Sequence, residues 1–242
     1  MINIVIPMAG LGSRFSNAGY EKPKPFIDVL GKPMIVRVME NLSHNNARFI
    51  LIARKEHMVA EAELIKDIQS KYNVIFVPVD KVTEGAACTI LHARKFINND
   101  TPLLLANSDQ IVDFDVAKYI NDCKDRNADG SILTFLDKMK SPKWSFAKIN
   151  SDGWVTRVQE KKVISDFATV GLYYFSKGSF FIDYAVDMIV DNERTNNEFY
   201  TCPVYNYAIK DLKKIGIYNI DFDCMHGIGT PDDLNIYLDK MS

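Results

Sequence analysis

The chain has 242 residues with a formal net charge of −2, and 47% of its residues are hydrophobic. This length suits one large α/β domain over residues 1–242, and the near-neutral charge gives no electrostatic reason to expect a nucleic acid partner. No apolar run approaches the roughly 20 residues of a membrane span, so we expect no membrane partner.

Cysteines and histidines further restrict the chemistry. The four cysteines are scattered without a Cys-x-x-Cys pair, and the four histidines lack metal-ligand spacing. These patterns indicate reduced thiols and a cytoplasmic location, and they argue against a zinc site. The oligomeric state is left open, with a homodimer as one option.

The first part of the chain alternates short apolar runs with amphipathic segments. We expect strands at 3–7, 49–53, 74–78, 103–106 and 130–136, and helices at 34–43, 58–71, 84–97 and 115–126. This alternation predicts a Rossmann-like, mostly parallel central sheet with helices on both faces. Ligands bind such sheets at the carboxyl ends of the strands.

The second part has a different pattern. Strands are expected at 144–149, 154–160, 168–174 and 215–220, and helices at 179–190, 199–212 and 231–240. A turn at Asn150-Ser-Asp-Gly153 favours antiparallel pairing of the strands beside it. No low-complexity linker separates the two parts, so we expect one domain with a small antiparallel elaboration, the parts meeting near residue 137.

The first strand leads into Met8-Ala-Gly-Leu-Gly-Ser-Arg14, and Lys24 follows between two prolines. Gly10 and Gly12 let the backbone turn tightly, so its amides and the two cations suit a polyphosphate. A dinucleotide-binding turn would need a third glycine where Phe15 stands, and a P-loop would need Gly-Lys-Ser/Thr. An ordinary glycine turn with surface cations is the remaining alternative.

These residues, together with Lys22-Pro-Lys-Pro25 and Val29-Leu-Gly-Lys-Pro-Met34, resemble the motif of nucleotidyltransferases that activate sugar phosphates and related phosphate esters. The resemblance implies that Arg14 holds the β- and γ-phosphates and that Lys24 reaches the α-phosphate. Lys22 is either a further contact or a surface cation. Backbone and side chains around the nucleotide are implied at Met8, Ala9, Gly10, Leu11, Gly12, Ser13, Glu84, Gly85, Ala86 and Ser108.

Asp109 follows an apolar strand and the small polar residues Asn107 and Ser108. It could cap the next helix or close a turn. By resemblance it is a Mg²⁺ ligand, and hard cations on phosphates use one or two carboxylates. Gly227 stands where many relatives carry a second metal-binding aspartate, so Asp223 or Asp221, His226 or water is expected to fill that position.

The turn at Glu84-Gly-Ala-Ala87 is implied to face the nucleobase, and Thr83 is a candidate N-cap for the helix that follows. On the acceptor side, Glu160-Lys-Lys162 could be a solvated charge run. The resemblance instead makes Lys161 a ligand of the acceptor phosphate. The implied acceptor-binding residues are Glu160, Lys161, Gly171, Glu198 and Tyr200.

The resemblance thus predicts an enzyme that condenses a nucleoside triphosphate with a small phosphorylated acceptor and releases pyrophosphate, using Mg²⁺. The motifs look most like small cytidylyltransferases of bacterial capsule clusters, which favours CTP with phosphoglutamine or a phosphocholine-like acceptor. A sugar-1-phosphate uridylyl- or thymidylyltransferase is the alternative enzyme. A non-catalytic nucleotide-binding regulator is the alternative of another class.

Overall fold

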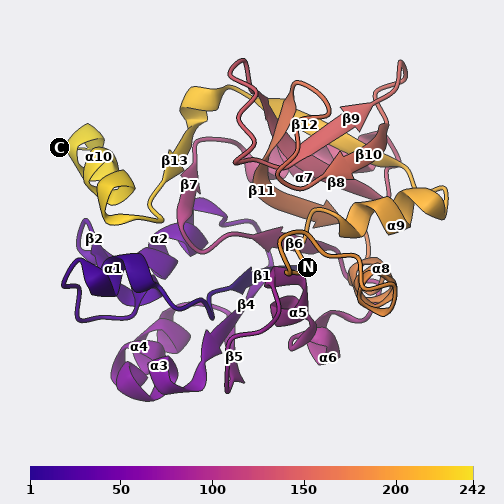
Figure 1. Cartoon of the computed structure of the whole chain (residues 1–242). Helices are drawn as coiled ribbons and strands as arrows, with labels where there is room; N and C mark the ends of the chain where they lie inside the picture. Colours follow the sequence, from indigo (N-terminus) through magenta and orange to yellow (C-terminus); the bar gives the residue numbers. More distant parts are fainter. Residues whose placement is uncertain (242) are drawn as a thin grey trace.

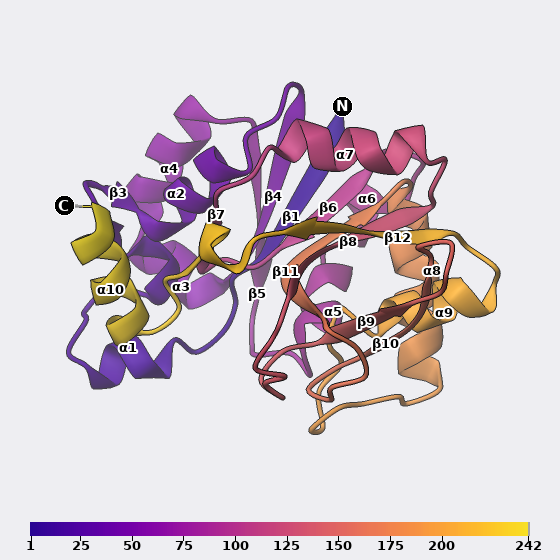
Figure 2. The ribbon, with the colours of Figure 1, turned by 90° about the horizontal axis from the view of Figure 1, so that it is seen from above.

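The computed structural model describes residues 1–241, and in this part of the chain nine strands form one mixed sheet with helices on both faces (Figure 1, Figure 2). The strands of this sheet are β1 (Ile2–Pro7), β4 (Ala47–Arg54), β5 (Val74–Val79), β6 (Leu103–Ala106), β8 (Gly130–Leu136), β9 (Phe146–Ile149), β10 (Val155–Gln159), β11 (Phe167–Phe175) and β12 (Ile215–Ile220). The helices are α1 (Ser13–Asn17), α2 (Met34–Asn41), α3 (Lys55–Ala60), α4 (Ala62–Lys71), α5 (Ala86–Leu91), α6 (Arg94–Ile97), α7 (Val116–Asp125), α8 (Gly178–Val190), α9 (Val204–Lys210) and α10 (Pro231–Met241).

The parallel part of the sheet has the order β6-β1-β4-β5, and its strands are apolar runs buried between two helical layers. Such runs are expected where helices cover both faces of a parallel sheet. The predicted Rossmann-like α/β fold is confirmed. The carboxyl ends of β1 and β6 lie side by side. The glycine-rich loop follows β1 and the Asn107–Asp109 segment follows β6, so both lie at the same edge of the sheet.

Strand β11 enters the central sheet instead of remaining in a separate elaboration. It pairs antiparallel to β8 along one edge and to β6 and β9 along the other. Because β11 is nine residues long and almost entirely buried, it reaches from the parallel strands to the β9–β10 pair. The strand at 130–136, expected with the parallel set, therefore runs antiparallel to β11 and parallel to β12.

Two apolar layers hold the sheet. One contains the buried sides of α2, α4 and α7, and the other contains those of α5, α6, α8 and α9. Figure 2 shows α2, α4 and α7 on one side of the strands and α5, α8 and α9 on the opposite side. In residues 1–241, no helix combines the length and apolar character needed to cross a membrane.

Three expected helices differ from the structure. The helix at 58–71 is two helices, α3 and α4, which meet at Glu61 with φ −112°. The helix at 84–97 begins at Ala86 and is interrupted between α5 and α6. The helix at 199–212 begins at Val204, because residues 199–203 instead form an irregular segment that contacts the start of α5.

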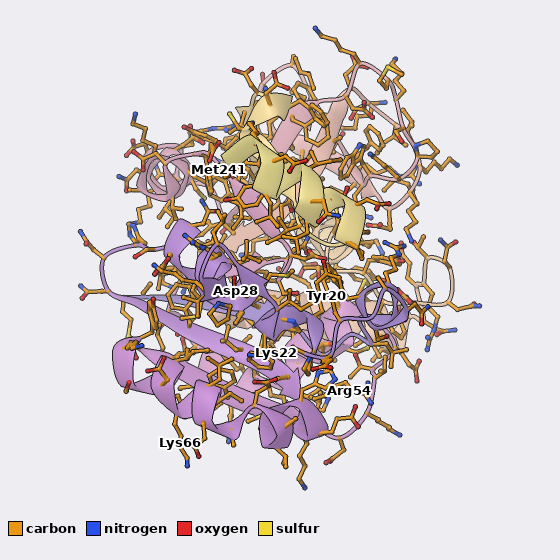
Figure 3. All side chains as sticks on the ribbon, turned by 90° about the vertical axis from the view of Figure 1, so that its left-hand side faces the viewer. Tyr20, Lys22, Asp28, Arg54, Lys66 and Met241 are labelled. Carbon is orange, nitrogen blue, oxygen red and sulfur yellow. The ribbon has the colours of Figure 1, made fainter. Side chains whose placement is uncertain are left out.

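Short elements complete the edge of the sheet where the loops gather. A 3₁₀ turn, η1 (Lys24–Phe26), precedes a hairpin of β2 (Asp28–Val29) and β3 (Lys32–Pro33). Strand β7 (Gln110–Val112) pairs with β13 (Met225–Gly227), which follows a second 3₁₀ turn, η2 (Phe222–Cys224). On the face shown in Figure 3, Tyr20 and Lys22 lie between α10 and the α3–α4 pair.

Candidate active site

The loop after β1 wraps around a cavity of about 340 Å³. Gly12 has φ +64°, and a Cβ on Gly12 would lie 3.1 Å from Cβ of Lys24, so the loop packs closely against the proline-flanked turn. Of the predicted nucleotide contacts, those that line this cavity are Met8, Ala9, Gly10, Gly12, Gly85, Ala86 and Ser108. Leu11 and Ser13 line neither this cavity nor its neighbour, and the Leu11 side chain is 63% exposed.

Lys24 and Asp109 form the centre of the site. Lys24 Nζ donates to Asp109 Oδ2 at 2.5 Å, and both side chains are partly shielded from solvent. The prolines on both sides of Lys24 fix the 3₁₀ turn that starts at this residue. The structure therefore places the predicted α-phosphate lysine directly beside the predicted metal ligand.

Asp109 is not a helix cap. Asp115 caps α7 itself, by accepting a hydrogen bond from the Lys118 amide at 3.0 Å. The late Gly-Thr segment instead packs on Asp109. The Ile228 amide donates to the Asp109 carbonyl at 2.9 Å, and a Cβ on Gly229 would lie 2.7 Å from Asp109 Oδ2. The carboxylate thus faces the cavities and is held by the chain from both sides.

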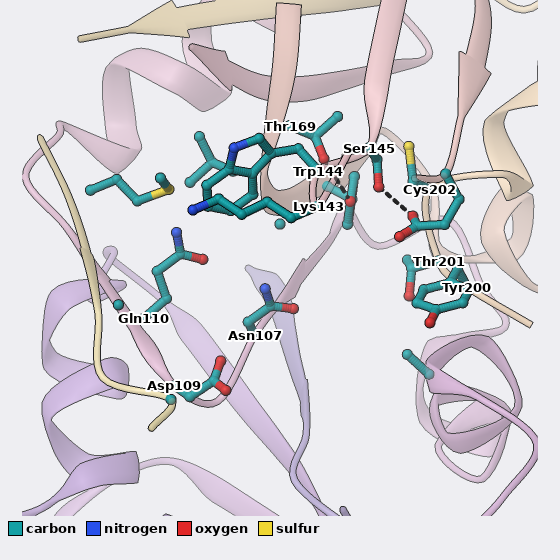
Figure 4. Close-up of a pocket in the computed structure, with 18 of the residues that line it drawn as sticks. Asn107, Asp109, Gln110, Lys143, Trp144, Ser145, Thr169, Tyr200, Thr201 and Cys202 are labelled. Carbon is teal, nitrogen blue, oxygen red and sulfur yellow. Dashed lines mark hydrogen bonds between the residues drawn. The ribbon is translucent and has the colours of Figure 1, made fainter. Parts of the chain in front are cut away.

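A second cavity, of about 510 Å³, adjoins the first (Figure 4). The two cavities share Lys24, Ala86, Asn107 and Asp109 as lining residues. Of the predicted acceptor residues, those that line the larger cavity are Glu160, Gly171 and Tyr200. Arg14, predicted to hold the β- and γ-phosphates, also lines this larger cavity rather than the glycine-loop cavity.

Glu160 is buried in the wall of the larger cavity. Ser145 Oγ donates a hydrogen bond to its carboxylate. Burial raises the pKa of Glu160, against the lowering effects of the Ser145 hydrogen bond and the nearby Lys161. Burial has removed water from this carboxyl group. Hydroxyl groups of a bound substrate could replace that water by donating hydrogen bonds to the Glu160 oxygens.

Lys161 lies next to the larger cavity but is not part of its lining. Its Nζ donates to the Tyr200 hydroxyl at 2.6 Å and lies 4.7 Å from the centre of that ring. The hydrogen bond to Tyr200, together with nearby carboxylates, raises the pKa of Lys161 against the effect of desolvation. An anion bound in the cavity would therefore compete with Tyr200 for this ammonium group.

The wall between α5 and the 198–200 segment is built around Gly85. This residue has φ +127°, and a Cβ would lie 2.5 Å from the Phe199 carbonyl oxygen. Phe199 donates to the Glu84 carbonyl at 2.8 Å and accepts from the Ala87 amide at 3.0 Å. Thr83, the expected N-cap, does not cap α5: its hydroxyl donates to the Gly85 carbonyl at 3.0 Å, and Gly85 is the N-cap residue.

Two predicted glutamates have different partners from those expected. Glu84 was predicted to contact the nucleotide, but its carboxylate pairs with Arg194 at 2.5 Å and lines neither cavity. Arg194 also lies 4.0 Å from the centre of the Phe199 ring. Glu198, predicted on the acceptor side, lines the glycine-loop cavity, and its carboxylate also lies close to Tyr200 and Lys161 of the acceptor side.

The structure does not bring Asp223 to Asp109. Asp221 and Asp223 line a separate cavity around η2, and His226 Nε2 contacts Asp113 Oδ2 at 2.7 Å. At Gly227, a Cβ would lie 3.9 Å from Cγ of Asp233, which lines the larger cavity and accepts a hydrogen bond from Thr230. Among residues 1–241, no cluster of three or more His, Cys, Asp or Glu side chains is arranged to hold a metal.

Sequence reasoning missed several residues of the larger cavity, namely Gln110, Lys143, Trp144, Ser145, Thr169, Tyr173, Thr201 and Cys202. Thr169 and Tyr173 lie within the predicted strand β11, and Lys143, Trp144 and Ser145 directly precede β9, but nothing in the local pattern indicates which side chain faces a cavity. The burial of the polar Ser145 and Thr169 beside Glu160 is visible only in the folded chain.

The fold and the paired cavities define an α/β protein with two adjoining cavities at the carboxyl ends of its strands, where such folds bind ligands. Residues 4–221 match the family model described as Nucleotidyl transferase, and the chain belongs to this family. A solved structure of a nucleoside-diphosphate-sugar pyrophosphorylase from Vibrio cholerae RC9 superposes with a TM-score of 0.82 at 24% identity, covering 98% of this chain and 99% of that one. This likeness confirms the fold.

Curated relatives match at lower coverage. A mannose-1-phosphate guanyltransferase of Yarrowia lipolytica is 27% identical over 70% of this chain and 48% of its own length. A bifunctional protein GlmU of Methanococcus maripaludis is 23% identical over 96% of this chain and 53% of its own length. The chain therefore spans about half the length of the curated relatives that it matches.

Proposed function

We propose that this protein transfers a nucleotidyl group from a nucleoside triphosphate to the phosphate of a sugar 1-phosphate and releases pyrophosphate. Two cavities that meet at Lys24, Asp109 and Asn107 carry this proposal. Ligands in adjoining cavities present their reacting atoms to each other, and such positioning can supply most of the rate acceleration in phosphoryl-type transfer.

The donor triphosphate is assigned to the glycine-loop cavity. No described residue hydrogen bonds to the backbone amides of Gly10, Leu11 or Gly12, which makes these amides free to bind phosphate oxygens. Lys24, at the junction, supplies positive charge beside the α-phosphate. Leaving pyrophosphate then develops its charge next to this lysine.

The acceptor is assigned to the larger cavity, where Glu160 accepts hydrogen bonds from its body and Lys161 binds its phosphate. An acceptor phosphate is already an anion near neutral pH, so attack on the α-phosphorus requires no general base. The lining residues of the two cavities include no histidine, so no Ser-His or Cys-His pair is found among them.

The donor set fits a magnesium ion held mainly by substrate phosphates. Mg²⁺ commonly binds through one or two carboxylates together with phosphate oxygens, and Asp109 provides one carboxylate at the junction of the cavities. When bound, the ion neutralises phosphate charge. Lys24 would release Asp109 on binding the phosphates, because its ammonium group contacts Asp109 in the free protein.

The choice of substrates follows the relatives. The sequence motifs favour CTP with phosphoglutamine or a phosphocholine-like acceptor, whereas the named relatives are a mannose-1-phosphate guanyltransferase and other proteins of sugar-nucleotide metabolism. This supports the alternative acceptor, a sugar 1-phosphate. The polar wall formed by Ser145, Glu160 and Thr169 suits a ligand that is rich in hydroxyl groups.

A pyrophosphate-release screen tests the proposal. Each of ATP, GTP, CTP, UTP and dTTP is combined with glucose, mannose, galactose and N-acetylglucosamine 1-phosphates, with phosphocholine and phosphoglutamine as further acceptors, with and without Mg²⁺. We expect release with at least one sugar 1-phosphate. Release only with phosphocholine or phosphoglutamine would contradict the sugar acceptor. Triphosphate binding by calorimetry without release in any pair would instead indicate a regulator.

A further inference from the structure

Asn107 lies at the place where the two cavities meet. It is the first residue after β6, it lines both cavities, and Figure 4 shows its carboxamide directed into the open space above Asp109. Ser108 and Asp109 follow it in the chain, so the three side chains leave the carboxyl end of one buried strand. A ligand that spans the cavities would pass beside this amide.

The opposite strand is shaped to accommodate Asn107. Gly171 of β11 has φ +93°, and a Cβ at this position would overlap Nδ2 of Asn107 and lie 3.0 Å from its Cγ. The pairing of β11 with β8 also shifts register between Thr169 and Tyr173, so the strand is irregular around Gly171. Bulges of this kind often adjust side chains next to active sites.

The carboxamide has no hydrogen-bond partner among residues 1–241, whereas its charged neighbours at the junction are paired with each other. The exposed Asn107 amide lies against Gly171, and its hydrogen bonds are left to solvent or a ligand. The Asn107 carboxamide is neutral, whereas Lys24 and Asp109 beside it are charged. It can therefore donate to a phosphate oxygen close to the Asp109 carboxylate without adding another charge.

We infer that Asn107 donates a hydrogen bond to a non-bridging oxygen of the α-phosphoryl group during transfer and aligns that group with the acceptor. This inference rests on the proposed function. In the transfer, an acceptor phosphate oxygen forms a bond to the α-phosphorus, and the bond from that phosphorus to the bridging oxygen of the β-phosphate breaks. Pyrophosphate leaves with the electron pair, and no proton has to move.

Asn107→Leu tests this role, because leucine has a similar size but donates no hydrogen bond. We expect kcat to fall by about 10²- to 10³-fold, the usual effect of removing a donor to transition-state charge. The dissociation constant of the triphosphate, measured by calorimetry, should remain close to that of the wild type, as should the melting temperature. Asn121→Leu on the exposed face of α7 is the matched control and should change none of these values.

Gly171→Ala provides a second test without altering the amide. Its new Cβ would displace Asn107, so kcat should fall, and the double variant with Asn107→Leu should be little worse than Asn107→Leu alone. Wild-type kcat in Asn107→Leu, or equal increases in both KM values with kcat unchanged, would overturn the assigned role while leaving the proposed function intact. A wild-type protein that releases no pyrophosphate would overturn both.

Discussion

Lys24 is the residue on which the proposed chemistry depends most directly. Lys24→Ala should lower kcat by about 10²- to 10³-fold and largely preserve triphosphate binding, because the glycine-loop amides remain. Steady-state kinetics and calorimetry measure the two effects separately. Lys66→Ala, which removes an exposed lysine of α4, is the control. Near wild-type turnover of the Lys24 variant at saturating substrates would refute its role.

Asp109 and Asp223 form a direct comparison of two carboxylates. Asp109→Asn should raise the Mg²⁺ concentration needed for half-maximal activity, because a carboxamide is a weaker ligand for a hard cation. Asp223→Asn should leave that concentration unchanged, since Asp223 lines the separate cavity around η2. A magnesium titration of both variants tests the assignment. The same shift in both variants would show that the metal site differs from the one proposed.

Lys161 should discriminate acceptor from donor. Lys161→Ala removes a charge-assisted hydrogen bond of about 1.5–3 kcal/mol, so the acceptor KM should rise roughly 10- to 150-fold, with a much smaller change for the triphosphate. The measurement varies each substrate in turn. Lys162→Ala, an exposed neighbour with the same charge, is the control. An increase confined to the triphosphate KM would show that Lys161 contacts the triphosphate and not the acceptor.

Among the elements, the wall formed by α5 and the 198–200 segment depends on Gly85. Gly85→Ala combines an unfavourable φ of +127° with a close contact to the Phe199 backbone. Backbone strain of this kind costs about 1–3 kcal/mol, and the displaced wall should also weaken triphosphate binding. Urea unfolding and calorimetry measure both effects.

Gly31→Ala is the matched control for Gly85→Ala. Gly31 has φ +80° but open space around its Cα, so this change introduces strain without a clash. It should destabilise the protein while leaving triphosphate affinity unchanged. Equal affinity in the two variants would mean that the wall does not contribute to the nucleotide site.

The elements also show what local sequence can and cannot predict. Strands β1, β4, β5 and β6 were predicted because their apolar runs need no partner to be identified. The antiparallel entry of β11 between β6 and β8 was not predicted, since pairing depends on residues distant in sequence. Arg14, Lys24 and Asp109 could be named from motifs and strand ends.

Other site residues could not be predicted, because their roles depend on tertiary contacts. Glu84 pairs with Arg194, which reaches α5 from a segment far along the chain. Asp223 lies near Gly227 in sequence, yet η2 directs it to a different cavity. Proximity in sequence was therefore misleading at Glu84 and Asp223.

For the molecule as a whole, Glu160 should link stability to pH. Burial raises its pKa in the folded protein above the ordinary value of 4.5, so between these two values the folded state binds more protons than the unfolded state. Its contribution to stability is therefore full below pH 4.5 and is lost as pH rises through the raised pKa. Above the raised pKa the ionised side chain opposes folding.

Glu160→Gln removes this ionisation and keeps the shape of the side chain. The variant should melt at a higher temperature than the wild type at pH 7, and the difference should shrink as the pH falls through the raised pKa toward 4.5. Its acceptor KM should rise, because the carboxylate that accepts hydrogen bonds from the acceptor is replaced by an amide.

Glu63→Gln, at an 87% exposed position of α4, is the control for loss of a charge. Melting curves of the three proteins across this pH range decide the matter. A stability gain that is independent of pH would show that folding does not change the pKa of Glu160. A variant less stable than the wild type at pH 7 would show that the carboxylate stabilises the cavity wall.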